Sequence, residues 1–134
     1  MTLEQVTQSI ADALQPLTSQ IPELLVVPRA MPQATPPCID IYPAREFQRG
    51  AGMGVGNTRV WFTVRARVNA NDDIAANSLL LRLLDPNGPD SVEAALVDAE
   101  AVLDNDQGLI TGFEVFPDSG GDLLGCTWTV GVFL

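Results

Sequence analysis

The sequence predicts an α+β fold: an antiparallel or mixed sheet of about four main strands, packed against an amino-terminal helix and a helix pair. Alternating apolar and polar residues, typical of strands, fill residues 58–69 and recur beyond residue 109. Residues with the 3.6-residue helical period occupy 3–17 and 71–96. Because strands and helices are segregated along the chain, we expect a helical layer on a sheet. With 134 residues, 46% of them hydrophobic, the chain 1–134 suits a single domain.

A first helix is expected at the amino terminus. Thr2 and Gln5 match a capping box, and Pro16 is expected to end the helix near Gln15, because the residue before a proline leaves the α region. The apolar residues that share one helical stripe are Leu3, Val6, Ile10, Ala13, Leu14 and Leu17.

Two short strands are expected to flank a stiff connection. The apolar run 24–27 forms the first, and the alternating run 38–42 forms the second, with Ile39 and Ile41 on one face and Asp40 on the other. Four prolines between residues 28 and 37 keep the connection extended. It is either a plain surface loop, the commoner case, or a partner-binding segment.

The segment 45–57 is rich in glycine. Nucleotide-binding loops of this composition open a helix or end in a lysine, whereas here a strand follows and the chain has no lysine. We therefore expect a hairpin loop that becomes ordered on assembly with neighbours. Its four glycines are Gly50, Gly52, Gly54 and Gly56.

Residues 58–69 form the strongest predicted strand. One face is apolar, from Val60 to Val68, and the other carries Arg59, Trp61, Thr63, Arg65 and Arg67. The arginines are expected to pair with carboxylates, either of the same chain or of the next subunit. Binding of single-stranded nucleic acid by stacking and charge is a further alternative, which the acidity of the chain disfavours.

The segment 71–96 predicts two helices and a tight corner. Asn71 and Asp72 are good N-cap residues for a helix that runs to Leu84, and Ser91 is the expected N-cap of the second. Between them, Pro86, Gly88 and Pro89 end the first helix.

The apolar arc of this first helix is too wide for one contact. Ile74, Leu80, Leu81 and Leu84 fall on one side, with further apolar residues beside them, and only Ala75, Ser78 and Arg82 form a clear solvent edge. We infer that the helix packs on its own sheet and is covered further by another element or by a neighbouring subunit.

The run 83–92, LLDPNGPDSV, followed by Ala94, Ala95 and Leu96, resembles the tail terminator proteins of long-tailed phages, especially those of actinobacterial hosts. The likeness extends loosely over the whole chain, including the final Leu-Gly-x-x-x-Thr-Val strand at 124–130. It implies a small structural virion protein that forms a hexameric ring, caps the tail tube and stops its polymerisation.

The same resemblance implies the partners. They are further copies of the chain, the tail tube protein and the head-to-tail connector or stopper, at the head-proximal end of the virion tail, with DNA passing through the lumen without specific binding. The alternatives are another neck or tube component and, more distantly, a small ligand-binding module that uses the glycine loop. The expected interface residues are Gly50, Gly52, Gly54, Gly56, Arg59, Arg65, Arg67, Asp85 and Asp90.

Charge is unevenly distributed. The chain has 17 acidic residues and 7 arginines, for a net charge of −10, and residues 83–134 hold ten of the acids and no basic residue. Such a surface would repel a phosphate backbone, so a protein that grips DNA is disfavoured. The acids serve either a negative ring lumen or solubility alone.

Several chemistries are excluded by composition. Without histidine, neither a Ser-His-Asp triad nor a histidine metal site is possible, and the acidic loop 104–108 lacks the bidentate glutamate of a calcium loop, since Val115 stands at that position. We expect no enzyme, cofactor or metal. The apolar runs are shorter than the roughly 20 residues that span a membrane. Cys38 and Cys126 are either paired or, as is commoner in cytoplasmic proteins, free.

Overall fold

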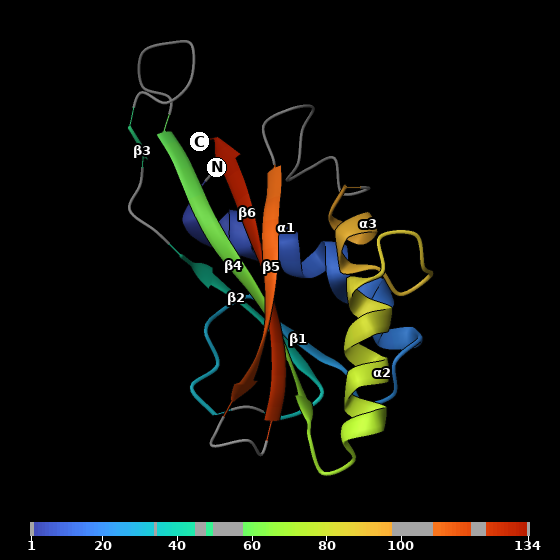
Figure 1. The fold of residues 1–134 in the computed structure, drawn as a ribbon. Coiled ribbons are helices and arrows are strands. Elements are labelled where there is room, and N and C mark those ends of the chain that lie inside the picture. The colour runs from blue at the N-terminus through green and yellow to red at the C-terminus, as the bar shows by residue number, and fades with distance from the viewer. Residues whose placement is uncertain are drawn as a thin grey trace.

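A mixed sheet with helices packed on it forms the molecule, as the sequence predicts (Figure 1). The computed structural model describes residues 2–33, 35–44, 48–49, 58–97, 109–118 and 123–133. In chain order the elements are α1 (Leu3–Leu14), the 3-10 helix η1 (Gln15–Ser19), β1 (Leu25–Val27), β2 (Cys38–Pro43), β3 (Gln48–Arg49), β4 (Thr58–Asn69), α2 (Asp73–Leu84), α3 (Val92–Val97), β5 (Leu109–Asp118) and β6 (Leu123–Phe133).

The strand order is β1-β2-β4-β6-β5, and the short β3 also pairs with β4. Four strands, β2, β4, β5 and β6, are the main ones, and β4 lies between β2 and β6 (Figure 1). The pairing of β1 with β2 is parallel and the other pairings are antiparallel. Parallel neighbours need a long connection between them, and the proline-rich segment 28–37 provides it.

Helix α1 begins and ends where the sequence predicts. Thr2 Oγ1 accepts a hydrogen bond from the Gln5 backbone N–H at 3.2 Å, and Gln5 Oε1 accepts from the Thr2 N–H at 2.8 Å, which completes the capping box. After Leu14 the chain continues as η1, with Pro16 in its first turn. The buried residues of α1 are Val6, Thr7, Ile10, Ala11 and Leu14.

One apolar cluster joins the helices to one face of the sheet. Ile39 and Ile41 of β2 belong to it, and so do Ala76, Leu80 and Leu83 of α2. The predicted alternation of β4 and β6 is confirmed, since the cluster takes every second residue of each strand: Val60, Phe62, Val64, Ala66, Val68, Cys126, Trp128, Val130 and Val132.

The helices of the described ranges all contribute to this cluster, and α3 contacts both α1 and α2. On the opposite face of β2, β4 and β6, no described helix is packed. None of the helices in the described part of the chain is long and apolar enough to span a membrane.

Candidate functional site

Helix α2 and the corner after it form as the sequence predicts. The Asp72 side chain accepts a hydrogen bond from the backbone N–H three residues on, at 3.2 Å, and so caps α2. Beyond Leu84, the Asp85 carboxylate accepts from the Asn87 backbone N–H at 2.9 Å. Ser91 Oγ then accepts from the backbone N–H three residues on, at 3.0 Å, as an N-cap of α3 does.

An ion pair closes the corner. Asp90 is 4% exposed, and its Oδ2 accepts from Arg82 Nε at 2.9 Å and from Arg82 Nη2 at 2.5 Å. The Arg82 side chain is half exposed. Asp90, one of the predicted interface residues, is therefore buried and pairs within its own chain, where it connects the end of α2 to the start of α3.

The apolar residues of α2 are divided between the core and the surface. Ala76, Leu80 and Leu83 face the core, whereas Ile74 is 80% exposed and Leu81 is 65% exposed. The prediction that Leu80 lies on the same side as Ile74 and Leu81 was wrong, whereas the expected solvent edge of Ala75, Ser78 and Arg82 is exposed. A 12-residue helix on a sheet can bury only one side of so wide an apolar arc, and the remainder faces solvent.

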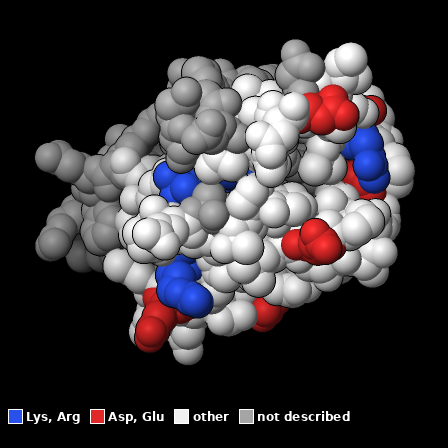
Figure 2. Space-filling model, turned by 90° about the horizontal axis from the view of Figure 1, so that it is seen from below, with Lys and Arg blue, Asp and Glu red and all other residues white. Residues whose placement is uncertain are grey.

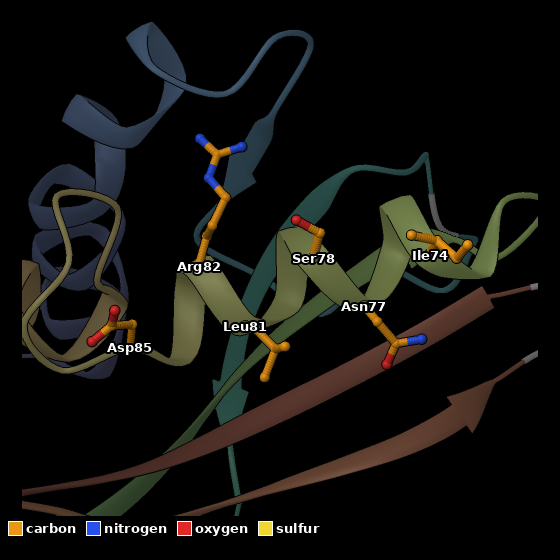
Figure 3. A pocket seen from close by; sticks show the side chains of 6 residues that line it. All are labelled: Ile74, Asn77, Ser78, Leu81, Arg82 and Asp85. Carbon is orange, nitrogen blue, oxygen red and sulfur yellow. The ribbon is translucent and has the colours of Figure 1, made fainter.

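The uncovered side forms a shallow groove along the helix (Figure 3). In that view Ser78 and Arg82 point to one side of the helix, and Asn77 and Leu81 point to the other. We call this surface the outward face of α2, and its residues are Ile74, Asn77, Ser78, Leu81, Arg82 and Asp85. It contains Asp85, another of the predicted interface residues.

A charged cluster occupies the opposite face of the sheet. Asp40 is fully buried and pairs with Arg65, whose Nε lies 3.0 Å from Oδ1 and whose Nη2 lies 2.5 Å from Oδ2. Arg67 Nη2 lies 3.5 Å from Asp40 Oδ2 and donates to the Met31 carbonyl at 2.8 Å. The Met31 N–H in turn donates to Asp40 at 2.9 Å. The cluster holds the proline-rich connection against the sheet.

The sequence left open whether the arginines pair with carboxylates of the same chain or of the next subunit. The structure shows that Arg65 and Arg67 pair with a carboxylate of the same chain. The partner, Asp40, was not identified from the sequence. A usable signal was present, because alternation places Asp40 on the polar face of its strand, and pairing of β2 with β4 sets it opposite Arg65.

Arg59 lies at the other end of β4. Its guanidinium stacks over the Trp61 ring, 4.2 Å from the ring centroid. Gly131 of β6 is directly opposite Trp61, and a Cβ there would lie 2.9 Å from atoms of both side chains. Glycine at this position therefore makes room for the stack.

The other predicted interface residues are the four glycines of the segment 45–57. Gly50, Gly52, Gly54 and Gly56 lie outside the described residues, as does the acidic loop 104–108. Side chains are described for only three of the ten acids beyond residue 82: Asp85, Asp90 and Glu93. On the face shown in Figure 2, acidic side chains are scattered and arginines lie among them, without a continuous patch of one sign in the described surface.

The two cysteines are free and buried. Cys38 lies on the face of the sheet that carries the Asp40 cluster, whereas Cys126 belongs to the apolar core on the other face, so a disulfide between them is excluded. Burial raises the pKa of the Cys126 thiol to about 12. Burial also raises the pKa of the Cys38 thiol, although the nearby Arg67 acts in the opposite direction.

The described residues contain no group of three or more potential metal ligands. The outward face of α2 carries Ile74 and Leu81, two of the three large hydrophobic side chains that are exposed among the described residues. No protein-family model matches this sequence, and no curated protein matches it significantly.

Proposed function

We propose that this protein is a tail terminator of a long-tailed phage, a structural virion protein whose copies form a ring on the head-proximal end of the tail tube. The observation that carries the proposal is the corner between α2 and α3. The run 83–92 that resembles tail terminators forms the end of α2, a tight turn and the capped start of α3, in which Asp90 pairs with Arg82 and Ser91 caps the helix.

The exposed side of α2 supports an assembling protein. A soluble monomer gains nothing from large apolar side chains such as Ile74 and Leu81 held outward on a rigid helix, and grouped exposed apolar residues are typical of interaction sites. In a ring, neighbouring copies or the tail tube protein would cover this surface.

Composition supports a role without catalysis. The chain lacks histidine and lysine, and its net charge of −10 favours free passage of DNA over binding. We expect no cofactor. The nearer alternative is a connector or stopper of the neck, and the distant one is a small ligand-binding module that uses the glycine-rich segment.

The test is electron microscopy of lysates from the parent phage with this gene deleted. Overlong tubes that are not attached to DNA-filled heads are the expected result. Tails of normal length that fail to join heads would identify a connector instead, and intact infectious particles would refute both roles.

Complementation of the deletion locates the working surface. A plasmid copy carrying Leu81→Ser is expected to restore fewer joined particles than the wild type. Leu25→Ser is the matched control, because Leu25 is also exposed, at 42%, but lies on β1 at the sheet edge. Equal rescue by both variants would show that the outward face of α2 is not used.

A further inference from the structure

We propose that in the free protein the outward face of α2 pairs with the same face of a second copy, antiparallel and about a two-fold axis. The large hydrophobic side chains that are exposed in the described part of the chain are Leu25, Ile74 and Leu81. Two of these three are on this one helix. They are seven residues apart, which is about two turns or 10 Å along the axis, and therefore point in nearly the same direction.

The order of residues along the face is nearly the same in both directions. Asn77 and Ser78, both small and polar, lie at its middle, and one large apolar residue lies on each side of them, Ile74 toward the start and Leu81 toward the end. When a second α2 is laid antiparallel across the middle, Ile74 of each copy faces Leu81 of the other. This is the self-complementary arrangement that a two-fold contact requires.

One pair of charges is complementary in the same arrangement, between Asp72, which lies just beyond the start of the face, and Arg82 near its end. Asp72, exposed at the start of α2, uses Oδ1 for the helix cap, so Oδ2 remains for a cation. Arg82, half exposed near the end, uses Nε and Nη2 for Asp90, so Nη1 remains for a second carboxylate. Antiparallel pairing brings Arg82 of each copy to the end of the helix at which Asp72 of the other copy lies. A parallel pairing would place like charges together, whereas the antiparallel pairing leaves Asp85 of each copy as the like charge at the acidic start of the other helix.

The middle of the face permits close approach. Packed helices have axes about 8–10 Å apart, and the distance depends on the side chains at the contact. Ser78 is small, and the shallow groove formed by the face (Figure 3) receives the ridge of the partner helix.

The size of the surface predicts a reversible dimer. A helix of 12 residues is about 18 Å long, and one of its faces is smaller than the roughly 800 Å² per partner of a stable complex. We therefore expect a dissociation constant in about the micromolar range. A ring of cyclic symmetry joins two different surfaces of neighbouring copies, so the two-fold contact must open before a copy enters it. The dimer would then be a storage form that releases monomers for tail capping, and this consequence rests on the proposed function.

Sedimentation equilibrium of the purified protein tests the contact, at about 0.15 M salt to screen the net charge. A monomer–dimer equilibrium is expected, and Leu81→Ser is expected to weaken it at least about tenfold, since the side chain is lost from both copies. Leu25→Ser should leave it unchanged. A wild type that stays monomeric to about 0.5 mM, or equal effects of both variants, would overturn the proposal.

Disulfide trapping tests the direction of the pairing. Ser78→Cys, next to the two-fold axis, is expected to form a cross-linked dimer under mild oxidation, whereas the wild-type thiols are buried and give none. Ile74→Cys and Leu81→Cys should each fail alone and should cross-link when mixed. Cross-linking of Ile74→Cys alone would show a parallel contact, and absence of any cross-link would show that the faces do not meet. Both outcomes refute the proposal, and neither bears on the phage deletion, so the two hypotheses fail separately.

Discussion

Asp40→Asn is expected to lower the free energy of unfolding by about 3–5 kcal/mol, the usual cost of removing one partner from a buried ion pair. Asp40 is 0% exposed, and the side chains of its partners Arg65 and Arg67 are 21% and 5% exposed. The asparagine would keep an oxygen for one donor but would place its NH₂ group against a guanidinium or the Met31 N–H. The two arginines would then lose the carboxylate that they share in this largely buried site.

For a domain of this size the change corresponds to a fall in melting temperature of about 10–20 °C. Urea and thermal unfolding followed by tryptophan fluorescence measure it, because Trp61 and Trp128 are both buried. Asp72→Asn is the matched control. It makes the same chemical change at an exposed N-cap, where asparagine caps as well as aspartate, so we expect a change below about 0.5 kcal/mol.

Two results would refute the reasoning. A cost of less than about 1 kcal/mol would mean that Asp40 is not the main group that compensates the charges of Arg65 and Arg67. A cost that depends on protein concentration would mean that the cluster is completed between copies, which was the other possibility that the sequence left open.

Three further predictions concern packing, capping and thiol chemistry. Gly131→Ala is expected to destabilise the protein by about 1–3 kcal/mol, because the new methyl group would overlap the stacked side chains of β4, and Thr129→Ala, which faces the same side of β6, should cost less in the same urea titration. Ser91→Ala removes the cap of α3 and should cost about 1 kcal/mol, and Ser91→Asn, which can still cap, should recover most of that loss. Cys38 and Cys126 should not react with Ellman's reagent at pH 8 until the protein is unfolded, and rapid reaction of the native protein would contradict their burial. Since the native Cys126 thiol keeps its proton to about pH 12 whereas an unfolded thiol titrates near 8.5, the free energy of unfolding should fall as pH rises through that window, and Cys126→Ala should remove this part of the pH dependence.

Most of the fold could be predicted from the sequence, because helix caps, prolines and strand alternation are local features of the chain. The ends of α1 follow from the Thr2 and Gln5 capping box and from Pro16, and the start of α2 follows from Asp72. The bounds predicted for β4, residues 58–69, are those observed, because twelve residues of strict alternation do not fit a helix.

The candidate site, the outward face of α2, could be predicted only in part from the sequence. The sequence indicated that α2 has more apolar surface than one contact can cover, but it did not indicate which residues remain outside. Leu80 and Leu81 are neighbours in sequence, yet Leu80 is 2% exposed and Leu81 is 65% exposed. The choice depends on how α2 is rotated on β4 and β6, which no residue within the helix specifies alone.

The sequence by itself determined where most helices and strands begin and end, since caps, prolines and alternation act over a few residues. It missed the short β3, Gln48–Arg49, which lies in the segment 45–57 that was expected to be a loop and pairs with β4. Only the tertiary structure decided which residues meet. Asp40 reaches Arg65 across 25 residues and Arg67 across 27, because strand pairing sets β2 beside β4. The same pairing separates Cys38 from Cys126 by placing them on opposite faces of one sheet, and the packing of α2 on that sheet leaves Ile74 and Leu81 outside. Contacts of this range depend on the whole chain being folded, so the local pattern cannot specify them.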